Sequence, residues 1–271
     1  MPVAGRGTRL FPLTRSQPKE MLPLGRRPTI EYVVDELAAA GIKRVIFVTS
    51  AGKRSIEEHL DSKKAAFGRG IRFGYTRQAE PRGLGHAVLC TQAFVGREPL
   101  VVALGDCVLG RRGRSDILSR MLACFEKERP SAVIAFEEVP RDHVERYGIA
   151  APRQDGDVFD LADLVEKPRR DQAPSSLAVA ARYVFAPEIL DALESTEPDH
   201  SGEIQLTDAV RRLIRDGRKV MGVRLAPGEP RYDVGSFEGY FRAFVDLALE
   251  DEEHGSELRD HLERRRERRD R

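Results

Sequence analysis

Apolar residues in the first half of the chain alternate between helical and strand spacing. TIEYVVDELAAAG, residues 29–41, places four large apolar residues on one helical face and ends at a glycine. RVIFVTS, residues 44–50, is a short β-branched run typical of a strand buried in a parallel sheet. The alternation continues with predicted helices over residues 55–68, 86–94 and 116–129, and predicted strands over residues 71–77, 100–106 and 131–139. This order predicts an α/β fold with a doubly wound, mostly parallel (mixed) sheet.

The second half has a more mixed pattern. It predicts strands near residues 147–149, 158–166, 177–185 and 219–227, and helices over residues 203–217 and 236–251. No stretch rich in Pro, Gly or Ser separates two units, so we expect one domain over residues 1–250. Residues 251–271 form a charged tail, which we expect to be a solvated helix docked by Leu258 and Leu262. Acidic residues interrupt its arginines, which disfavours a nucleic-acid arm.

Composition narrows the class of protein. The 271 residues are 41% hydrophobic and 33% charged with a net charge of +1, so no global field attracts nucleic acid or a membrane surface. Cys90, Cys107 and Cys124 form no CxxC pair, and the histidines lack ligand spacing, so we expect reduced thiols and no structural metal. Neither a signal peptide nor an apolar run of about 20 residues is evident. We therefore expect a cytoplasmic protein without nucleic-acid or membrane partners.

The opening stretch PVAGRGTRLFPLTRSQPKEMLPL contains a turn suited to an anion. Gly5 and Gly7 let the backbone approach a ligand closely, while Arg9 and Lys19 add positive charge. The turn lacks the third glycine of a dinucleotide fingerprint and the GK[ST] of a Walker loop. On its own it is as typical of a structural turn as of a binding loop.

A second glycine-containing loop, QAEPRGLGHAV, follows the predicted strand at residues 71–77. The amide of Gln78 offers the paired donor and acceptor that the edge of a pyrimidine requires. Gly83 and Gly85 again permit close backbone approach. The alternative interpretation is a glycine loop that caps a helix.

Acidic residues end two of the predicted strands. Asp106 follows an apolar strand, where a carboxylate is costly unless it is hydrated, paired or metal-bound. Asp233 lies after the strand at residues 219–227, just before a glycine and a helix. Ligands of open α/β sheets lie beyond such strand ends, and Mg²⁺ takes one or two carboxylates together with substrate phosphates. The two aspartates therefore fit a metal-assisted phosphate reaction, and helix or turn caps are the alternative.

The segment LVEKP ends another strand with Glu166 and Lys167. Adjacent residues of an extended chain point to opposite sides, so one can accept hydrogen bonds from sugar hydroxyls while the other meets a phosphate. A surface ion pair is the alternative interpretation.

These segments together carry a family resemblance. PVAGRGTR…PKEMLPL, QAEPRGLGHAVLC, LGD, YGI, VEKP, GEIQLTDAV and YDVGSFEGY, in this order from residue 2 to about 244, resemble the bacterial glucose-1-phosphate uridylyltransferases (UDP-glucose pyrophosphorylases). The resemblance implies a Rossmann-like nucleotidyltransferase fold, with a nucleotide half at about 1–110 and a sugar half at about 111–250. It also implies a homo-oligomer, a dimer or a tetramer. The implied reaction is in-line attack by glucose 1-phosphate on the α-phosphorus of UTP, which gives UDP-glucose and pyrophosphate.

The resemblance implies a role for each matching residue. The implied catalytic residues are Arg9, Lys19 and Lys167. The implied nucleotide-binding residues are Ala4, Gly5, Gly7, Thr8, Gln78 and Gly83. The implied sugar-binding residues are Tyr147, Gly148, Glu166 and Lys167, the last of these for the sugar phosphate. Asp106 and Asp233 are the implied ligands of Mg²⁺, the expected cofactor.

Three features depart from the family pattern. Only FGRG separates the helix at residues 55–68 from the next strand, where the family usually has a helical insertion. Ala181 stands where glycine is usual. Only Met1 precedes PVAG, so we expect a truncated first strand, and either a start further upstream or a destabilised protein. The alternatives are therefore a thymidylyltransferase, a nucleotidyltransferase for another sugar 1-phosphate, and a catalytically impaired nucleotide-binding module.

Overall fold

A six-stranded mixed sheet forms the centre of the molecule in the computed structural model, which describes residues 1–63, 67 and 70–269. In spatial order its strands are β5 (Leu100–Ala103), β10 (Leu177–Phe185), β7 (Ala132–Glu138), β11 (Val220–Arg224), β9 (Val158–Glu166) and β8 (Gly148–Pro152). β7 and β11 pair in parallel, whereas the other pairings of this sheet are antiparallel. The expected mixed α/β sheet is confirmed, but the antiparallel share is larger than the pattern predicted.

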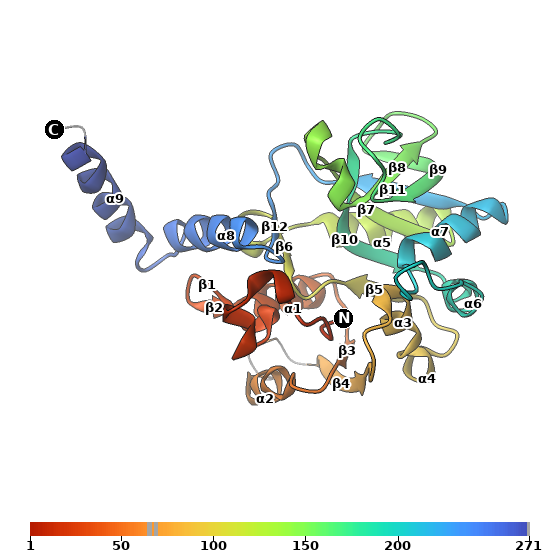
Figure 1. The fold of residues 1–271 in the computed structure, drawn as a ribbon, viewed down its shortest axis with the longest axis horizontal. Coiled ribbons are helices and arrows are strands. Elements are labelled where there is room, and N and C mark those ends of the chain that lie inside the picture. Colours follow the sequence, from red (N-terminus) through yellow and green to blue (C-terminus); the bar gives the residue numbers. More distant parts are fainter. Residues whose placement is uncertain (64–66, 68–69, 270–271) are drawn as a thin grey trace.

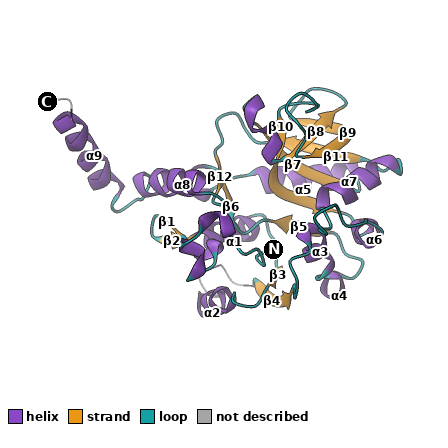
Figure 2. Ribbon diagram, in the orientation of Figure 1, coloured by secondary structure: helices purple, strands orange, loops and turns teal. Residues whose placement is uncertain are grey.

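Helices cover both faces of this sheet, as a doubly wound fold requires (Figure 2). Val133 and Ala135 of β7 pack with α5 (Ile117–Glu128), while Ile134 and Phe136 pack with α6 and α7 on the opposite face. α6 spans Glu188–Glu194 and α7 spans Leu206–Arg215. Every position of β10 is buried, which explains why its sequence shows no alternation of apolar and polar residues.

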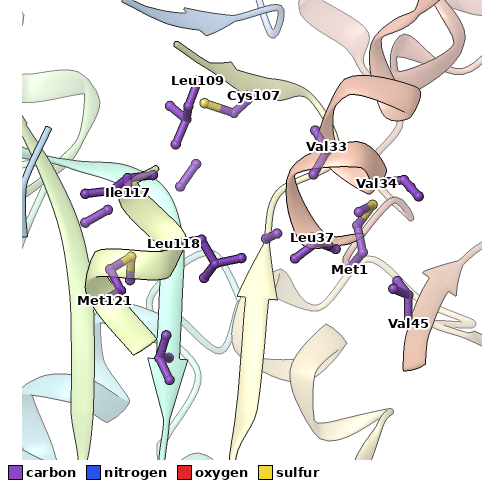
Figure 3. Packing of buried hydrophobic residues seen from close by; sticks show 14 of the residues in the cluster. Met1, Val33, Val34, Leu37, Val45, Cys107, Leu109, Ile117, Leu118 and Met121 are labelled. Carbon is purple, nitrogen blue, oxygen red and sulfur yellow. The ribbon is translucent and has the colours of Figure 1, made fainter. Parts of the chain in front are cut away.

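A parallel pair, β3 (Arg44–Thr49) and β4 (Arg72–Arg77), lies beside the N-terminus (Figure 1). It packs with α1 (Thr29–Ala39), and α2 (Arg54–Lys63) follows β3; the remainder of the helix expected over residues 55–68 falls mostly outside the described residues. Residues 1–3 run alongside β3 and meet it through an isolated parallel bridge from Pro2 to Val48. Figure 3 shows the Met1 side chain among buried residues of α1 and β3. A cleft of about 640 Å³ lies between β3 and β5.

Two expected elements are interrupted. The strand predicted over residues 100–106 ends at Ala103, and the chain turns before β6 (Cys107–Leu109), which pairs with β12 (Arg231–Asp233). The helix predicted over residues 86–94 begins earlier and breaks into α3 (Gly83–Leu89) and α4 (Gln92–Val95). The hydroxyl of Thr91 donates to the carbonyl of Val88, 2.7 Å away, at this break.

The C-terminal region forms α8 (Phe237–Leu249) and α9 (Gly255–Arg269), which extend away from the sheet (Figure 1). α8 begins at Ser236, whose hydroxyl accepts a hydrogen bond from the backbone of Gly239. The charged tail is helical as expected, but Leu262 is 43% exposed and does not dock it. Within the described residues, no helix is both long and apolar enough to span a membrane.

Shorter elements complete the chain. They are the strands Pro23–Leu24 (β1) and Arg27–Pro28 (β2) and the 3-10 turns Thr8–Leu10, Leu13–Arg15, Lys19–Met21, Arg111–Gly113 and Arg141–Arg146.

Candidate active site

The opening glycine turn lies at the carboxyl end of β3. Ser50, directly after β3, donates a hydrogen bond through Oγ to the carbonyl of Ala4 at 2.9 Å. Gly7 has a φ of 66°, a left-handed conformation that glycine adopts at little cost. Gly5 is exposed, and a Cβ at this position would lie 3.8 Å from Nζ of Lys19. The turn therefore presents accessible backbone next to a lysine, as an anion site requires.

Lys19 and Asp106 form the charged centre of this region. Nζ of Lys19 donates a hydrogen bond to Oδ2 of Asp106, and the two side chains are 17% and 16% exposed. Burial alone would lower the pKa of Lys19, but the nearby carboxylates of Asp106, Glu20 and Asp233 raise it above its usual value. Burial likewise opposes ionisation of Asp106, yet the Lys19 ammonium lowers the pKa of that carboxyl. Both groups are consequently charged at neutral pH.

Asp233 lies beside Asp106 across the β6–β12 ladder. The backbone N–H of Val234 donates to the carbonyl of Asp106 at 3.0 Å, and the N–H of Gly235 donates to Oδ1 of Asp233 at 2.8 Å. A Cβ at Gly235 would lie 2.8 Å from that oxygen and 3.0 Å from Nη2 of Arg9. The absence of a side chain at Gly235 therefore lets Arg9 approach Asp233, and the fold brings residues from both ends of the chain to one site.

The donor set at this point suits a hard divalent cation. Asp106 and Asp233 offer carboxylate oxygens, and Asp233 is 38% exposed, so a ligand can reach it. In the described part of the chain, no cluster of three or more His, Cys, Asp or Glu side chains is placed to hold a metal ion. Two carboxylates without a third protein ligand match a metal that completes its coordination with substrate phosphates and water, the usual arrangement for Mg²⁺.

The loop around Gln78 meets the opening turn at the end of β3. The N–H of Gln78 donates to the carbonyl of Thr49 at 2.8 Å, next to the Ser50 that holds Ala4. The Gln78 side chain is buried, and its Nε2 lies 3.0 Å from both the carbonyl of Gly83 and Nδ1 of His86. The Gln78 amide is thus fixed by its own loop, and His86 accepts one of its hydrogen bonds when the imidazole is neutral.

Gly83 and Gly85 serve close packing against the segment that precedes α7. A Cβ at either glycine would lie 2.7 Å from the carbonyl oxygen of Ile204, which is too close for any side chain. The N–H of Gly85 donates to that same carbonyl at 2.8 Å, and the N–H of Ile204 donates to the carbonyl of Arg82 at 2.9 Å. The motifs GLGHAV and GEIQLTD, far apart in sequence, therefore pack against each other, and Gly83 is the first residue of α3.

The predicted sugar-binding residues also come together. Gly148 pairs with Glu166 across β8 and β9, and a Cβ at Gly148 would lie 3.3 Å from Oε2 of Glu166. That oxygen accepts a hydrogen bond of 2.7 Å from the hydroxyl of Thr207, in the first turn of α7. The N–H of Lys167 donates to the carbonyl of Tyr147 at 3.0 Å. Tyr147, Gly148, Glu166 and Lys167 thus form one cluster at the end of β9.

The expectation that Glu166 and Lys167 point to opposite sides is wrong. Lys167 has a φ of 43°, so the chain leaves the extended conformation directly after β9. The alternation of side chains holds only within a regular strand, and here Nζ of Lys167 lies 3.0 Å from Oε1 of Glu166. The two residues form a partly exposed ion pair.

Sequence reasoning missed two residues that join these clusters. Arg231 places its guanidinium carbon 4.5 Å from the ring centroid of Tyr147, and it forms ion pairs with Glu137 and, at 3.7 Å, with Asp233. Thr207 supports Glu166 as described above. The sequence offered one signal for Thr207, its place within GEIQLTD, whereas nothing in the local sequence linked Arg231 to Tyr147.

The chemistry of the site follows from its charges. Lys19, Arg9 and two carboxylates surround accessible backbone N–H groups at the strand ends, which suits the alignment and charge neutralisation of phosphate groups. A phosphate nucleophile is already ionised near neutral pH and needs no general base. The fold and the site therefore define an enzyme of the nucleotidyl-transfer class.

Comparison with known proteins identifies the family. Residues 3–250 match the family model described as nucleotidyl transferase, and the chain belongs to this family. It is 39% identical over 261 residues to the UTP–glucose-1-phosphate uridylyltransferase of Pseudomonas aeruginosa strain PAO1, an alignment that covers 89% of this chain and 92% of that protein. Nucleotidyltransferases of this kind generally use a divalent metal ion.

Solved structures give the same result. The UTP-bound UGPase from Acinetobacter baumannii superimposes with a TM-score of 0.85 at 36% identity, and the match covers 96% of each chain. A UDP-glucose pyrophosphorylase complexed with UDP-glucose also gives a TM-score of 0.85, at 35% identity, over 92% of this chain and 97% of that one. The predicted family resemblance is confirmed.

Proposed function

We propose that this protein transfers UMP from UTP to glucose 1-phosphate, giving UDP-glucose and pyrophosphate. The observation that carries the proposal is the similarity, over nearly the whole chain, to uridylyltransferases whose structures hold UTP and UDP-glucose. The packing of GLGHAV against GEIQLTD adds to it, because these two motifs connect the opening turn with the Glu166 cluster.

The nucleotide is proposed to lie along the carboxyl end of β3. Backbone groups of the glycine turn and the Gln78 loop would hold the base and ribose, and Arg9 would bind the phosphates. Lys19 would contact the α-phosphate, because its ammonium lies beside the exposed Gly5 and remains charged. The residues proposed for nucleotide binding are Ala4, Gly5, Gly7, Thr8, Gln78 and Gly83.

The sugar phosphate is proposed to bind at the end of β9. Glu166, oriented by Thr207, would accept hydrogen bonds from glucose hydroxyls, with Tyr147 and Gly148 beside it. Lys167 is 57% exposed, so its ammonium is free to leave Glu166 and meet the phosphate of glucose 1-phosphate. The attacking phosphate and the nucleotide would then meet near the Asp106–Asp233 pair.

The reaction is an in-line displacement. An oxygen of glucose 1-phosphate attacks the α-phosphorus of UTP, and the bond to the pyrophosphate leaving group breaks. Lys19 and Arg9 would stabilise the negative charge on the oxygens around the α-phosphorus. Asp106 and Asp233 would hold Mg²⁺, which neutralises phosphate charge when it is bound. Catalysis then depends on alignment and charge rather than on proton transfer.

Three further expectations from the sequence stay predictions. They are a homo-oligomer, a cytoplasmic location, and the division into a nucleotide half and a sugar half. The oligomer prediction is checked by light scattering coupled to size exclusion, where a monomer mass would contradict it.

A substrate panel tests the proposed function. Purified protein is supplied with Mg²⁺ and each combination of UTP, dTTP, ATP and GTP with the 1-phosphates of glucose, galactose and N-acetylglucosamine. We expect the highest kcat/KM for pyrophosphate release with UTP and glucose 1-phosphate. A preference for dTTP would indicate a thymidylyltransferase, and binding of UTP without pyrophosphate release would indicate an inactive binding module.

A further inference from the structure

Arg182, in β10, is the largest completely buried side chain among the described residues. Its guanidinium donates from Nη2 to the carbonyl of Cys107 at 2.9 Å and from Nη1 to the carbonyl of Ala181 at 3.0 Å. The Ala181 carbonyl also accepts the N–H of Leu104 at 3.2 Å. Asp106 lies in the turn over residues 104–107. Arg182 and Ala181 thus hydrogen-bond the two ends of this turn to β10.

The backbone of β10 is shaped for this contact. Ala181 has a φ of 60°, and the pairing of β10 with β7 shifts between Val179 and Tyr183, which marks a bulge. Bulges interrupt a ladder and redirect side chains and carbonyl groups. At the bulge, the Ala181 carbonyl accepts hydrogen bonds from the N–H of Leu104 and from the Arg182 guanidinium, and not from a residue of β7.

The other side of the guanidinium is fixed by Glu36 of α1. Nε and Nη2 of Arg182 donate to the two carboxylate oxygens of Glu36 at 3.0 and 2.6 Å, in the bidentate geometry that fixes a guanidinium most firmly. The first residue of α1, Thr29, bonds the carbonyl of Leu22 through both its N–H and its hydroxyl. Leu22 directly follows the 3-10 turn that carries Lys19.

We propose that Arg182, held by Glu36, is a positioning residue that fixes the turn of Asp106 relative to the segment of Lys19. The Glu36–Arg182 pair joins the same two parts of the molecule that the Lys19–Asp106 pair joins at the surface of the site. A buried ion pair is weak as a source of stability, because removing two charges from water offsets most of their attraction. Its value here is geometric, since the guanidinium that Glu36 fixes makes two further hydrogen bonds, one to Cys107 in the Asp106 turn and one to Ala181.

The test uses Arg182→Lys, which keeps the charge but loses the fork of donors, and Glu36→Gln, which keeps the shape of the acceptor but loses its charge. The control is Glu31→Gln on the same helix; Glu31 is also buried and ion-paired, with Arg27, but does not contact the turn. Hydrogen–deuterium exchange is measured without metal and without substrates. We expect residues 104–107 and Val234 to exchange about tenfold or more faster in both test variants, and at the wild-type rate in the control.

The kinetic readout rests on the proposed function. We expect kcat to fall about tenfold or more in the test variants while KM for glucose 1-phosphate changes little, because misplacement of a reacting group lowers the rate of the chemical step. The Mg²⁺ concentration for half-maximal rate should rise in the test variants and not in the control. If wild-type protein shows no turnover, the proposed function fails while the exchange experiment still tests Arg182.

Other outcomes would overturn the inference. A lower Tm with unchanged exchange at residues 104–107 would assign Arg182 a purely structural role, and so would an equal effect in Glu31→Gln. If Arg182→Lys does not fold, Glu36→Gln alone decides: wild-type exchange at the turn contradicts the inference, and faster exchange confined to the turn supports it.

Discussion

Lys19 donates a hydrogen bond from Nζ to Oδ2 of Asp106, although 87 residues separate them in the chain. The carboxylate keeps the pKa of Lys19 above its usual value in spite of burial, and the ammonium keeps the pKa of Asp106 below its usual value. The pair therefore brings two opposite full charges to the place where the strand ends, the glycine turn and Asp233 meet.

Replacement of Asp106 by Asn should abolish most of the activity. The amide removes a negative charge that a divalent cation needs and leaves Lys19 without its ion-pair partner. We expect kcat to fall by about 10²–10³-fold, comparable to the loss of an electrostatic stabiliser in other enzymes. Steady-state pyrophosphate release measures the effect, with Asp116→Asn as the control because that carboxylate is 71% exposed and forms an ion pair with Arg120 rather than with a residue of the site. Turnover retained in Asp106→Asn would contradict the proposed metal role.

Alanine substitutions at Gly83 and Gly52 separate the energetic cost of a strained backbone from the cost of a steric clash. Both have a φ of 87°, but a Cβ at Gly83 would collide with the carbonyl of Ile204, whereas nothing lies within 4 Å of a Cβ at Gly52. We expect Gly83→Ala to lower the free energy of unfolding by about 1–3 kcal/mol more than Gly52→Ala, the usual cost of overpacking. Urea unfolding measures both values. Equal losses would mean that the two motifs do not pack as described.

Thr207→Val should weaken binding of the sugar phosphate. The substitution keeps the shape of the side chain but removes the donor that orients Oε2 of Glu166. We expect KM for glucose 1-phosphate to rise about five- to tenfold and KM for UTP to stay unchanged, because one hydrogen bond to a partly exposed carboxylate is lost. Thr196→Val is the control, since the Thr196 hydroxyl, just after the end of α6, donates a hydrogen bond to the carbonyl of Ala192 in that helix and not to a residue of the site. A larger effect on UTP than on the sugar phosphate would refute this assignment.

UTP binding should weaken in mild acid through His86. Burial and the nearby Arg82 lower the pKa of His86 below its ordinary value of 6.5, so the folded state favours the neutral ring. The unfolded state then binds more protons just below pH 6.5, and stability falls as the pH drops from 6.5 to the lowered pKa. Protonated Nδ1 is unable to accept the hydrogen bond from Gln78.

The pH effect is measured as KM for UTP between pH 7.5 and about 5.5, a range that brackets an ordinary histidine. Substrate phosphates titrate in the same range, so the comparison is with His86→Asn, whose carbonyl oxygen replaces Nδ1 as an acceptor that does not titrate. We expect KM to rise more steeply in acid for the wild type than for the variant. Parallel curves would show that His86 has no part in the pH dependence.

The sequence predicted the elements and the strand-end residues because both depend on local signals. Periodic apolar residues marked β3, α1 and α5, and a carboxylate after an apolar strand marked Asp106. Strand directions were harder to predict, since β10 is buried at every position and its sequence shows no alternation that would distinguish a parallel from an antiparallel sheet.

The local sequence pattern did not predict contacts between residues that lie far apart in the chain. Arg182 and Glu36 lie 146 residues apart, and only the folded chain brings them together. The expectation that Glu166 and Lys167 point to opposite sides was wrong because Lys167 has a left-handed backbone, which the local sequence did not indicate.

A radiolabelled nucleotide tests the transfer of UMP from UTP to glucose 1-phosphate most directly. UTP labelled with ³²P at the α-phosphate is incubated with the protein, Mg²⁺ and glucose 1-phosphate, and the products are separated by chromatography. We expect the label to appear in UDP-glucose, with one pyrophosphate released for each UDP-glucose formed, and Asp106→Asn to suppress both. Label that stays in UTP, or that is released as UMP without forming UDP-glucose, would contradict it.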